Sequence, residues 1–188
     1  GYHWFEVWGR DTFVSLPGLM LVTGRYEDAR RIFLSFKKDC KQGLIPNFLP
    51  DQLGQPTYNA VDATLWLVNA VLQYLKYTGD YRFVQDQLWE TLKAIVDNYV
   101  KGTVFDIHMD SDGLLSHGPQ LTWMDAAVDA QPITPRAGKA VEVQAVWYNT
   151  LKIMELLANG FKERSGADKY GEIAEKARRS FTEKFWNP

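Results

Sequence analysis

One carboxylate of this chain lies in a setting that suits proton donation. Asp125 ends the run Gly118-Pro-Gln-Leu-Thr-Trp-Met-Asp, directly after Trp123 and Met124, where glycine and proline disfavour a helix. Bulky apolar neighbours disfavour the charged form of a carboxyl group, which can then keep its proton near neutral pH. A surface aspartate that opens a turn is the alternative interpretation. Asp125 is therefore a candidate general acid.

Other charged side chains gather where the predicted helices begin. Arg10 and Asp11 lie at the start of the first predicted helix, with Asp11 placed to cap it, and Asp62 lies at the start of the third. Lys139 and Glu142 lie at the start of the fifth. Each acid could simply be a cap or a first-turn residue, because helix N-termini favour carboxylates. If the helices stack as hairpins, however, these N-termini meet and form one polar pocket together with the candidate acid.

The apolar periodicity predicts an all-α fold of helical hairpins. The expected helices are residues 12–22, 26–39, 61–78, 81–100, 140–159 and 170–185. Tight turns at residues 23–26, 78–81 and 165–170 join them in pairs, whereas the long loops 42–60 and 102–138 connect the pairs. A short β-hairpin is expected to turn at residues 111–113. Each hairpin must bury its open face against the next, which favours a solenoid or an α/α toroid.

Composition narrows the range of partners. A chain of 188 residues with 46% hydrophobic side chains can bury the core of one ordinary domain. The net charge of -2 gives no reason to expect a nucleic acid or an anionic membrane as partner. A single cysteine, Cys40, excludes an internal disulfide and fits a reducing compartment such as the cytoplasm. Three histidines without metal-ligand spacing predict no metal, and nothing in the sequence calls for a cofactor.

Carboxylates, aromatic rings and the absence of a cofactor motif predict glycoside hydrolysis. Arginine and aspartate can fork the vicinal hydroxyls of a sugar, and flat rings can stack on its C–H faces. Trp4 and Trp8 lie directly upstream of Arg10, in a segment that could also be buried packing. Tyr58 and Trp123 lie close in sequence to the other carboxylates.

Four motifs resemble the glucosidase domain of glycogen debranching enzymes, specifically the amylo-α-1,6-glucosidase part in its bacterial and archaeal form. They occur in the family's order, and the resemblance covers essentially the whole chain. The motifs are Trp4-Phe-Glu-Val-Trp-Gly-Arg-Asp-Thr-Phe13, Tyr58-Asn-Ala-Val-Asp-Ala63, Leu121-Thr-Trp-Met-Asp-Ala126 and Gly138-Lys-Ala-Val-Glu-Val-Gln-Ala-Val-Trp-Tyr-Asn149.

The resemblance implies an (α/α)6 barrel, of which residues 1–188 would be the N-terminal half, a single-domain fragment of about six helices. It also implies inverting removal of α-1,6-linked glucose from glycogen or a related α-glucan. Arg10 and Asp11 would hold the non-reducing-end glucose, and Asp125 would be the general acid. The general base is expected beyond the end of this sequence, and within it Glu142 is the substitute. An open half-barrel edge would favour self-association.

The sugar ligands expected from these motifs are Trp4, Trp8, Arg10, Asp11, Tyr58, Asp62, Trp123, Lys139 and Glu142. Two non-catalytic functions remain as alternatives, a carbohydrate-binding module and an interaction scaffold of helical hairpins. The acidic run 106–113 could also be read as a calcium loop. It has Ser111 where an EF-hand needs glycine, and no glutamate at its end, so the β-hairpin is favoured.

Overall fold

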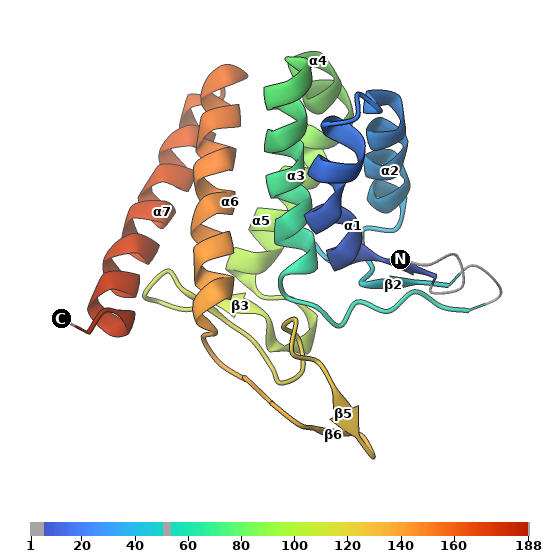
Figure 1. The fold of residues 1–188 in the computed structure, drawn as a ribbon. Helices are drawn as coiled ribbons and strands as arrows, with labels where there is room; N and C mark the ends of the chain where they lie inside the picture. The colour runs from blue at the N-terminus through green and yellow to red at the C-terminus, as the bar shows by residue number, and fades with distance from the viewer. Residues whose placement is uncertain (1–5, 51–53, 188) are drawn as a thin grey trace. The chain divides into compact units, whose positions relative to one another are not determined.

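The computed structural model describes residues 6–50 and 54–187, and it divides into two compact units, Gly1–Ile95 and Val96–Pro188 (Figure 1). Both are built mainly from helices, in agreement with the all-α prediction, and short two-stranded β-ribbons occur only in the connecting segments that the structure describes.

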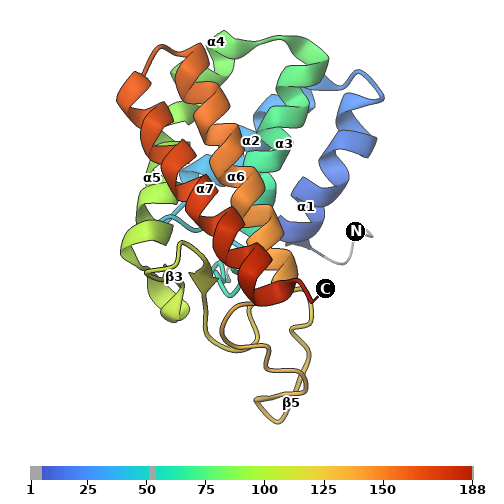
Figure 2. The same ribbon diagram turned by 90° about the vertical axis from the view of Figure 1, so that its left-hand side faces the viewer.

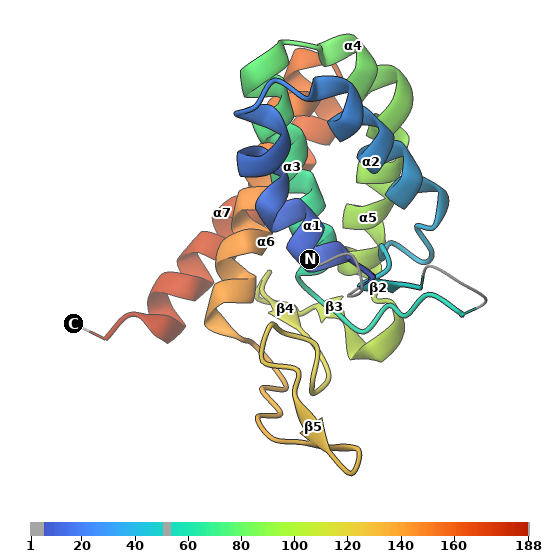
Figure 3. The ribbon, with the colours of Figure 1, turned by 45° about the vertical axis from the view of Figure 1, so that its right-hand side comes forward.

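The first unit is built mainly from helices. Its helices are α1 (Gly9–Leu16), which continues as the π-helical turn η1 (Pro17–Leu21), α2 (Tyr26–Lys38), α3 (Ala63–Thr78), α4 (Tyr81–Phe83), the π-helical turn η2 (Val84–Leu88), and the first part of α5 (Trp89–Lys101). Strand β1 (Val7–Trp8) pairs antiparallel with β2 (Phe48–Leu49). Helix α1 packs against α3, and the views of Figures 1 and 3 agree on this.

Aromatic rings fill the core of the first unit. Phe13 of α1 stacks on Phe33 of α2 with centroids 5.8 Å apart, and Phe33 meets Tyr74 of α3 edge-on at 5.8 Å. All three side chains are fully buried. The Tyr74 hydroxyl accepts a 2.7 Å hydrogen bond from Arg30, which also pairs with Asp80 in the turn after α3. The packed apolar faces of the helices and the contacts of Arg30 with Tyr74 and Asp80 both stabilise the helical hairpins of this unit.

The second unit contains a helical hairpin and two β-hairpins. Its elements are η3 (Val104–Asp106), β3 (His108–Met109), β4 (Leu115–Ser116), β5 (Ala127–Val128), β6 (Gln131–Pro132), α6 (Val141–Gly160) and α7 (Arg164–Phe185), after the end of α5. Helices α6 and α7 lie side by side along their length (Figure 2). The loop that carries β5 and β6 extends away from the N-terminal end of α6 (Figures 1 and 3).

Two side chains of α6 fasten the first β-hairpin. Buried Gln144 donates to the backbone oxygen of Leu115 and accepts from its backbone nitrogen, both at 2.8 Å. The Trp147 indole donates to the oxygen of Gly113 at 3.1 Å. Because Gln144 satisfies both polar groups of a buried strand residue, the strand can lie on the helix without unpaired backbone groups.

The structure confirms most of the predicted helices and corrects their limits in two places. Helix α1 begins at Gly9, so Asp11 lies in its first turn and is not the N-cap that the sequence predicted. The predicted turn at residues 165–170 was wrong, because α7 begins at Arg164. Gly166 lies inside this helix because packing of α7 along α6 outweighs the low helix propensity of a single glycine. The β-hairpin at residues 111–113 is confirmed.

Candidate functional site

The start of α1 is joined to the start of α3 by an ion pair. Arg10 Nε donates to both carboxylate oxygens of Asp62 at 2.9 Å, and its NH2 group lies 2.8 Å from Oδ1. The two side chains are 14% and 5% exposed. Asp62 occupies the N-cap position of α3 but makes no side-chain cap bond, since its carboxylate is directed to Arg10. The sequence therefore correctly placed these two helix starts side by side.

Gly9 explains why the first motif reads Trp-Gly-Arg-Asp. A Cβ atom at Gly9 would lie 2.2 Å from the backbone oxygen of Pro46, and the Gly9 nitrogen donates to the oxygen of Asn47 at 2.9 Å. Only glycine permits this approach between α1 and the segment before β2. The contact fixes the position at which Arg10 leaves the helix start.

A cleft of about 220 Å³ lies beside the same helix start and contains two of the predicted sugar ligands, Trp8 and Asp11. It is lined by Glu6, Val7, Trp8, Asp11, Thr12, Ser15, Leu16, Leu19, Met20 and Ile32. The Trp8 ring is supported by Phe48, with centroids 5.0 Å apart. Two carboxylates and an indole around one cavity of this size can bind a polar ligand with an apolar face, such as a sugar.

Tyr58 makes contacts within its own connecting segment. Its hydroxyl donates to the backbone oxygen of Asp39 at 2.8 Å, and the Lys41 ammonium lies 5.7 Å from the ring centroid. These contacts hold the segment between α2 and α3 in place. The expected role of Tyr58 as a sugar ligand stays a prediction, and that of Trp4 concerns a residue outside those the structure describes.

In the second unit, Asp125 lies on a long loop between β4 and α6 whose two ends are fastened together. His117 and Gly138 exchange backbone hydrogen bonds of 3.1 and 2.8 Å, and the Gly118 nitrogen donates to the oxygen of Phe105 at 3.0 Å. A Cβ atom at Gly118 would lie 2.9 Å from that same oxygen, so glycine is required here. These hydrogen bonds fix the two ends of the loop relative to each other.

Apolar side chains on this loop face solvent. Trp123 is 61% exposed, Val128 60% and Ile133 62%. The sequence predicts contact between Trp123 and Asp125, but most of the indole surface is open. An exposed indole two residues from a carboxylate offers a stacking surface for the flat face of a sugar.

Glu142, in the first turn of α6, is held by Arg136. The Arg136 guanidinium forks both carboxylate oxygens, with NH2 2.6 Å from Oε2 and NH1 bonded to Oε1. Burial alone would raise the pKa of Glu142, but the guanidinium outweighs it and the pKa is lowered. Glu142 is therefore an anion at neutral pH, the form that a general base needs, but Arg136 engages both of its oxygens.

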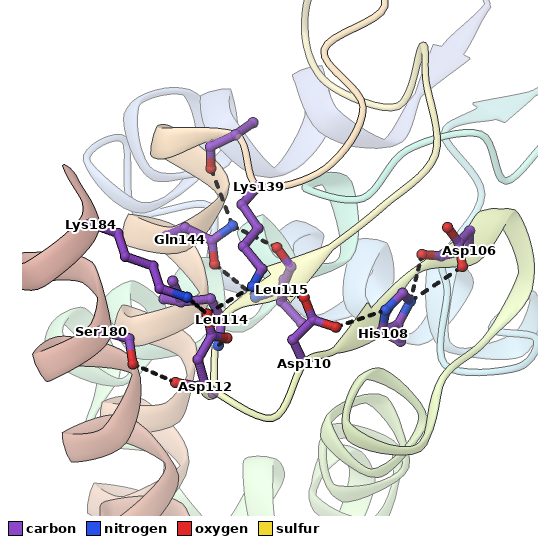
Figure 4. A network of polar contacts seen from close by, with 12 residues as sticks. Asp106, His108, Asp110, Asp112, Leu114, Leu115, Lys139, Gln144, Ser180 and Lys184 are labelled. Atoms are coloured by element: carbon purple, nitrogen blue, oxygen red, sulfur yellow. Dashed lines mark hydrogen bonds and ion pairs between the residues drawn. The ribbon is translucent and has the colours of Figure 1, made fainter.

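Lys139 belongs to an ionic cluster that secures the first β-hairpin (Figure 4). Its ammonium lies 2.7 Å from Asp110 Oδ2 and 2.7 Å from Asp112 Oδ2. Lys184 of α7 pairs with the same Asp112, and Ser180 donates to the Asp112 backbone oxygen at 2.8 Å. Burial would raise the pKa of Asp112, but the two ammonium groups lower it well below its usual range. The contacts of Lys139 are thus with the hairpin, and its role as a sugar ligand stays a prediction.

The structure thus brings predicted site residues together in the first unit. In the first unit Arg10 contacts Asp62, and Trp8 lines a cleft with Asp11. In the second unit, the contacts of Arg136 were not predicted from the sequence. The only signal for it was its place in the run Pro135-Arg-Ala-Gly-Lys, ahead of Glu142.

Within residues 6–50 and 54–187, no group of three or more histidine, cysteine, aspartate or glutamate side chains is arranged to hold a metal ion. Over the same residues, no helix has both the length and the apolar character needed to cross a membrane.

Comparisons with known proteins agree with the sequence resemblance. The family described as amylo-alpha-1,6-glucosidase matches residues 1–188. The glycogen debranching enzyme of Saccharomyces cerevisiae is 30% identical over 98% of this chain, and the match spans 15% of that protein's length.

Two solved structures share the helical fold. A rhamnosidase from Klebsiella oxytoca with rhamnose bound matches with a TM-score of 0.64 and 19% identity, over 92% of this chain and 33% of that one. The GH78 family rhamnosidase of Bacillus sp. GL1 matches with a TM-score of 0.65 and 19% identity, over 96% of this chain and 18% of that one. At this identity the likeness concerns the fold, and it agrees with the α/α toroid class expected from the sequence.

Proposed function

Because the chain belongs to the amylo-alpha-1,6-glucosidase family, we propose that it provides part of a glycoside hydrolase that removes α-1,6-linked glucose from branch points of glycogen or related α-glucans. The observation that carries the proposal is the family match over residues 1–188. The cleft lined by Trp8 and Asp11, and the exposed Trp123 on the loop that carries Asp125, support a carbohydrate ligand.

We assign Asp125 the role of general acid. In the proposed step its proton moves to the glycosidic oxygen while the bond from that oxygen to C1 of the terminal glucose breaks. A water molecule adds to C1 from the opposite face and loses a proton to a base, so the products are β-glucose and a glucan with a free C6 hydroxyl. Because a C6 alkoxide is a poor leaving group, protonation in the transition state is expected to contribute about 10²–10⁴-fold.

Other residues bind sugar in this proposal. Asp11 and Trp8 line the cleft of the first unit, where a carboxylate can accept from hydroxyls and an indole can cover a C–H face. Trp123 supplies a second stacking surface on the loop of the acid. Glu142 is poorly suited to be the general base, since Arg136 occupies both of its oxygens.

The test is product analysis with the intact polypeptide that contains these residues. The substrate is a branched maltodextrin that carries single α-1,6-linked glucose stubs, and a linear maltodextrin is the control. We expect free glucose from the branched substrate only, seen first as the β-anomer by proton NMR.

Release of α-glucose first would overturn the inverting mechanism, and release from the linear control would overturn the linkage. Calorimetric binding of the branched substrate without any turnover would favour a carbohydrate-binding module instead.

A further inference from the structure

One arginine connects three segments around the turn that carries Asp125. Besides the fork to Glu142 of α6, Arg136 NH1 donates to the hydroxyl of Thr122 at 3.3 Å. Thr122 is 1% exposed, and its hydroxyl also accepts from the backbone nitrogen of Met124 at 3.3 Å. The chain of contacts therefore runs from the first turn of α6, through Arg136 and Thr122, to the residue next to Asp125.

A second contact holds the main chain of the same turn. Gln120 Nε2 donates to the backbone oxygen of Asp125 at 2.8 Å. The Gln120 nitrogen in turn donates to the backbone oxygen of Pro135 at 2.9 Å, directly before Arg136. Both sides of the turn are thus fastened to the segment that carries the guanidinium.

The backbone bears a cost for this arrangement. Gln120 has φ 62° and Arg136 has φ 49°, the left-handed region that side-chain-bearing residues avoid. Such conformations persist where the surroundings determine them, and they concentrate at sites where geometry matters. Asp129 and Ala130 on this loop also have positive φ, at the tip of the β5–β6 hairpin, whereas the side chains of Gln120 and Arg136 reach the Asp125 turn.

We propose that Arg136 is a positioning residue, which fixes the Asp125 turn against the start of α6 by bridging Glu142 to Thr122. The inference rests on the proposed function, in which Asp125 is the acid. The lowered pKa of Glu142 fits it, since an ionised carboxylate keeps the guanidinium in place near neutral pH. The role differs from catalysis, because Arg136 acts on the acid's main chain through Thr122.

The test compares Arg136→Met with Arg178→Met. Arg178 makes a similar fork, with Nε 2.9 Å and NH2 2.8 Å from the two oxygens of Glu175, but on the exposed face of α7. Hydrogen-exchange mass spectrometry of the intact polypeptide follows the peptide that covers residues 119–126. We expect Arg136→Met to speed its exchange about tenfold and Arg178→Met to leave it unchanged, since exchange reports local opening.

Kinetics provide the second readout. Arg136→Met should lower kcat for an α-1,6-linked substrate about 10- to 100-fold with little change in KM, because small displacements of a catalytic group have effects of this size. The loss of kcat should be smaller on glucosyl fluoride, whose leaving group needs little protonation. Arg136→Lys keeps the charge but not the planar fork, so it should fold like the parent protein. Its kcat on the α-1,6-linked substrate should lie between that of the parent and that of Arg136→Met.

Unchanged exchange at residues 119–126 in both Arg136 variants would overturn the proposal. So would equal losses of kcat on the glucoside and the fluoride, which indicate a general structural defect. A different result would contradict the proposed function: full activity of Asp125→Asn would show that Asp125 is not the general acid. In that case the hydrogen-exchange experiment would still report whether Arg136 holds the turn.

Discussion

The pair between Arg10 and Asp62 allows a quantitative prediction about the first unit. Arg10→Met removes a guanidinium whose contacts with the carboxylate measure 2.8–2.9 Å. Because the Asp62 side chain is only 5% exposed, the substitution leaves a buried charge without its main partner. Removing one partner of a buried pair costs about 3–5 kcal/mol, whereas an exposed pair contributes about 0–1 kcal/mol. We expect a loss of about 3 kcal/mol in the free energy of unfolding.

Urea unfolding followed by far-UV circular dichroism measures this loss. With a slope of about 1–3 kcal/mol per molar urea, the midpoint of the transition should fall by about 1–3 M. The double variant Arg10→Met, Asp62→Leu removes both charges and should recover most of the loss, because two apolar side chains of similar size need no partner. Arg82→Met is the control, since its 3.4 Å pair with Asp86 joins side chains that are 91% and 54% exposed.

Two results would refute this reasoning. In one, Arg10→Met shifts the midpoint no more than Arg82→Met does. In the other, the double variant loses as much stability as the two single variants added together, which would mean that the two side chains do not interact.

Two further predictions concern the hairpin cluster and the start of α1. Asp112→Asn should destabilise the chain by about 1.5–3 kcal/mol at pH 7, since charged hydrogen bonds are lost. The folded-state pKa of Asp112 is lowered, so this stabilisation is present above the ordinary pKa of 3.8 and is lost as the pH falls below that value. The unfolding curves of the parent and the variant should therefore converge as the pH falls below 3.8. A constant difference in unfolding free energy down to pH 2 would contradict this prediction. Gly9→Ala should lower the unfolding free energy by about 1–3 kcal/mol because its methyl group would meet a backbone oxygen at 2.2 Å, whereas Gly18→Ala, with open space around it, should not; equal thermal midpoints for the two variants would disprove the close contact.

The helices could be predicted from the sequence because their apolar faces repeat at helical spacing. Helix ends marked by glycine could be predicted as well: the sequence predicts a break at Gly79, and this residue has φ 64° at the end of α3. The start of α7 could not be predicted, since glycine disfavours a helix locally and only the packing of α7 along α6 outweighs that preference at Gly166. Similarly, the second β-hairpin turns at Asp129 and Ala130, both with positive φ, without the asparagine or glycine that such turns favour.

The candidate site was predictable in part for the same reason. Residues at helix starts follow from the helices themselves, and this is how Arg10 and Asp62 were matched. The contacts that hold the Asp125 turn depend on left-handed backbone at Gln120 and Arg136, which no local sequence pattern predicts. The exposure of Trp123 likewise depends on how the loop leaves α6, which is a property of the folded chain.

The most direct test of Asp125 as the general acid is the Asp125→Asn variant, measured in the intact polypeptide on an α-1,6-linked glucan and on α-glucosyl fluoride. We expect a loss of about 10²–10⁴-fold in kcat on the glucan, with binding kept and a much smaller loss on the fluoride, because only the glucan's leaving group needs a proton. Asp129→Asn, at the tip of the hairpin on the same loop, should change neither. Equal losses on both substrates, or full activity on the glucan, would contradict the assignment of Asp125 as the acid.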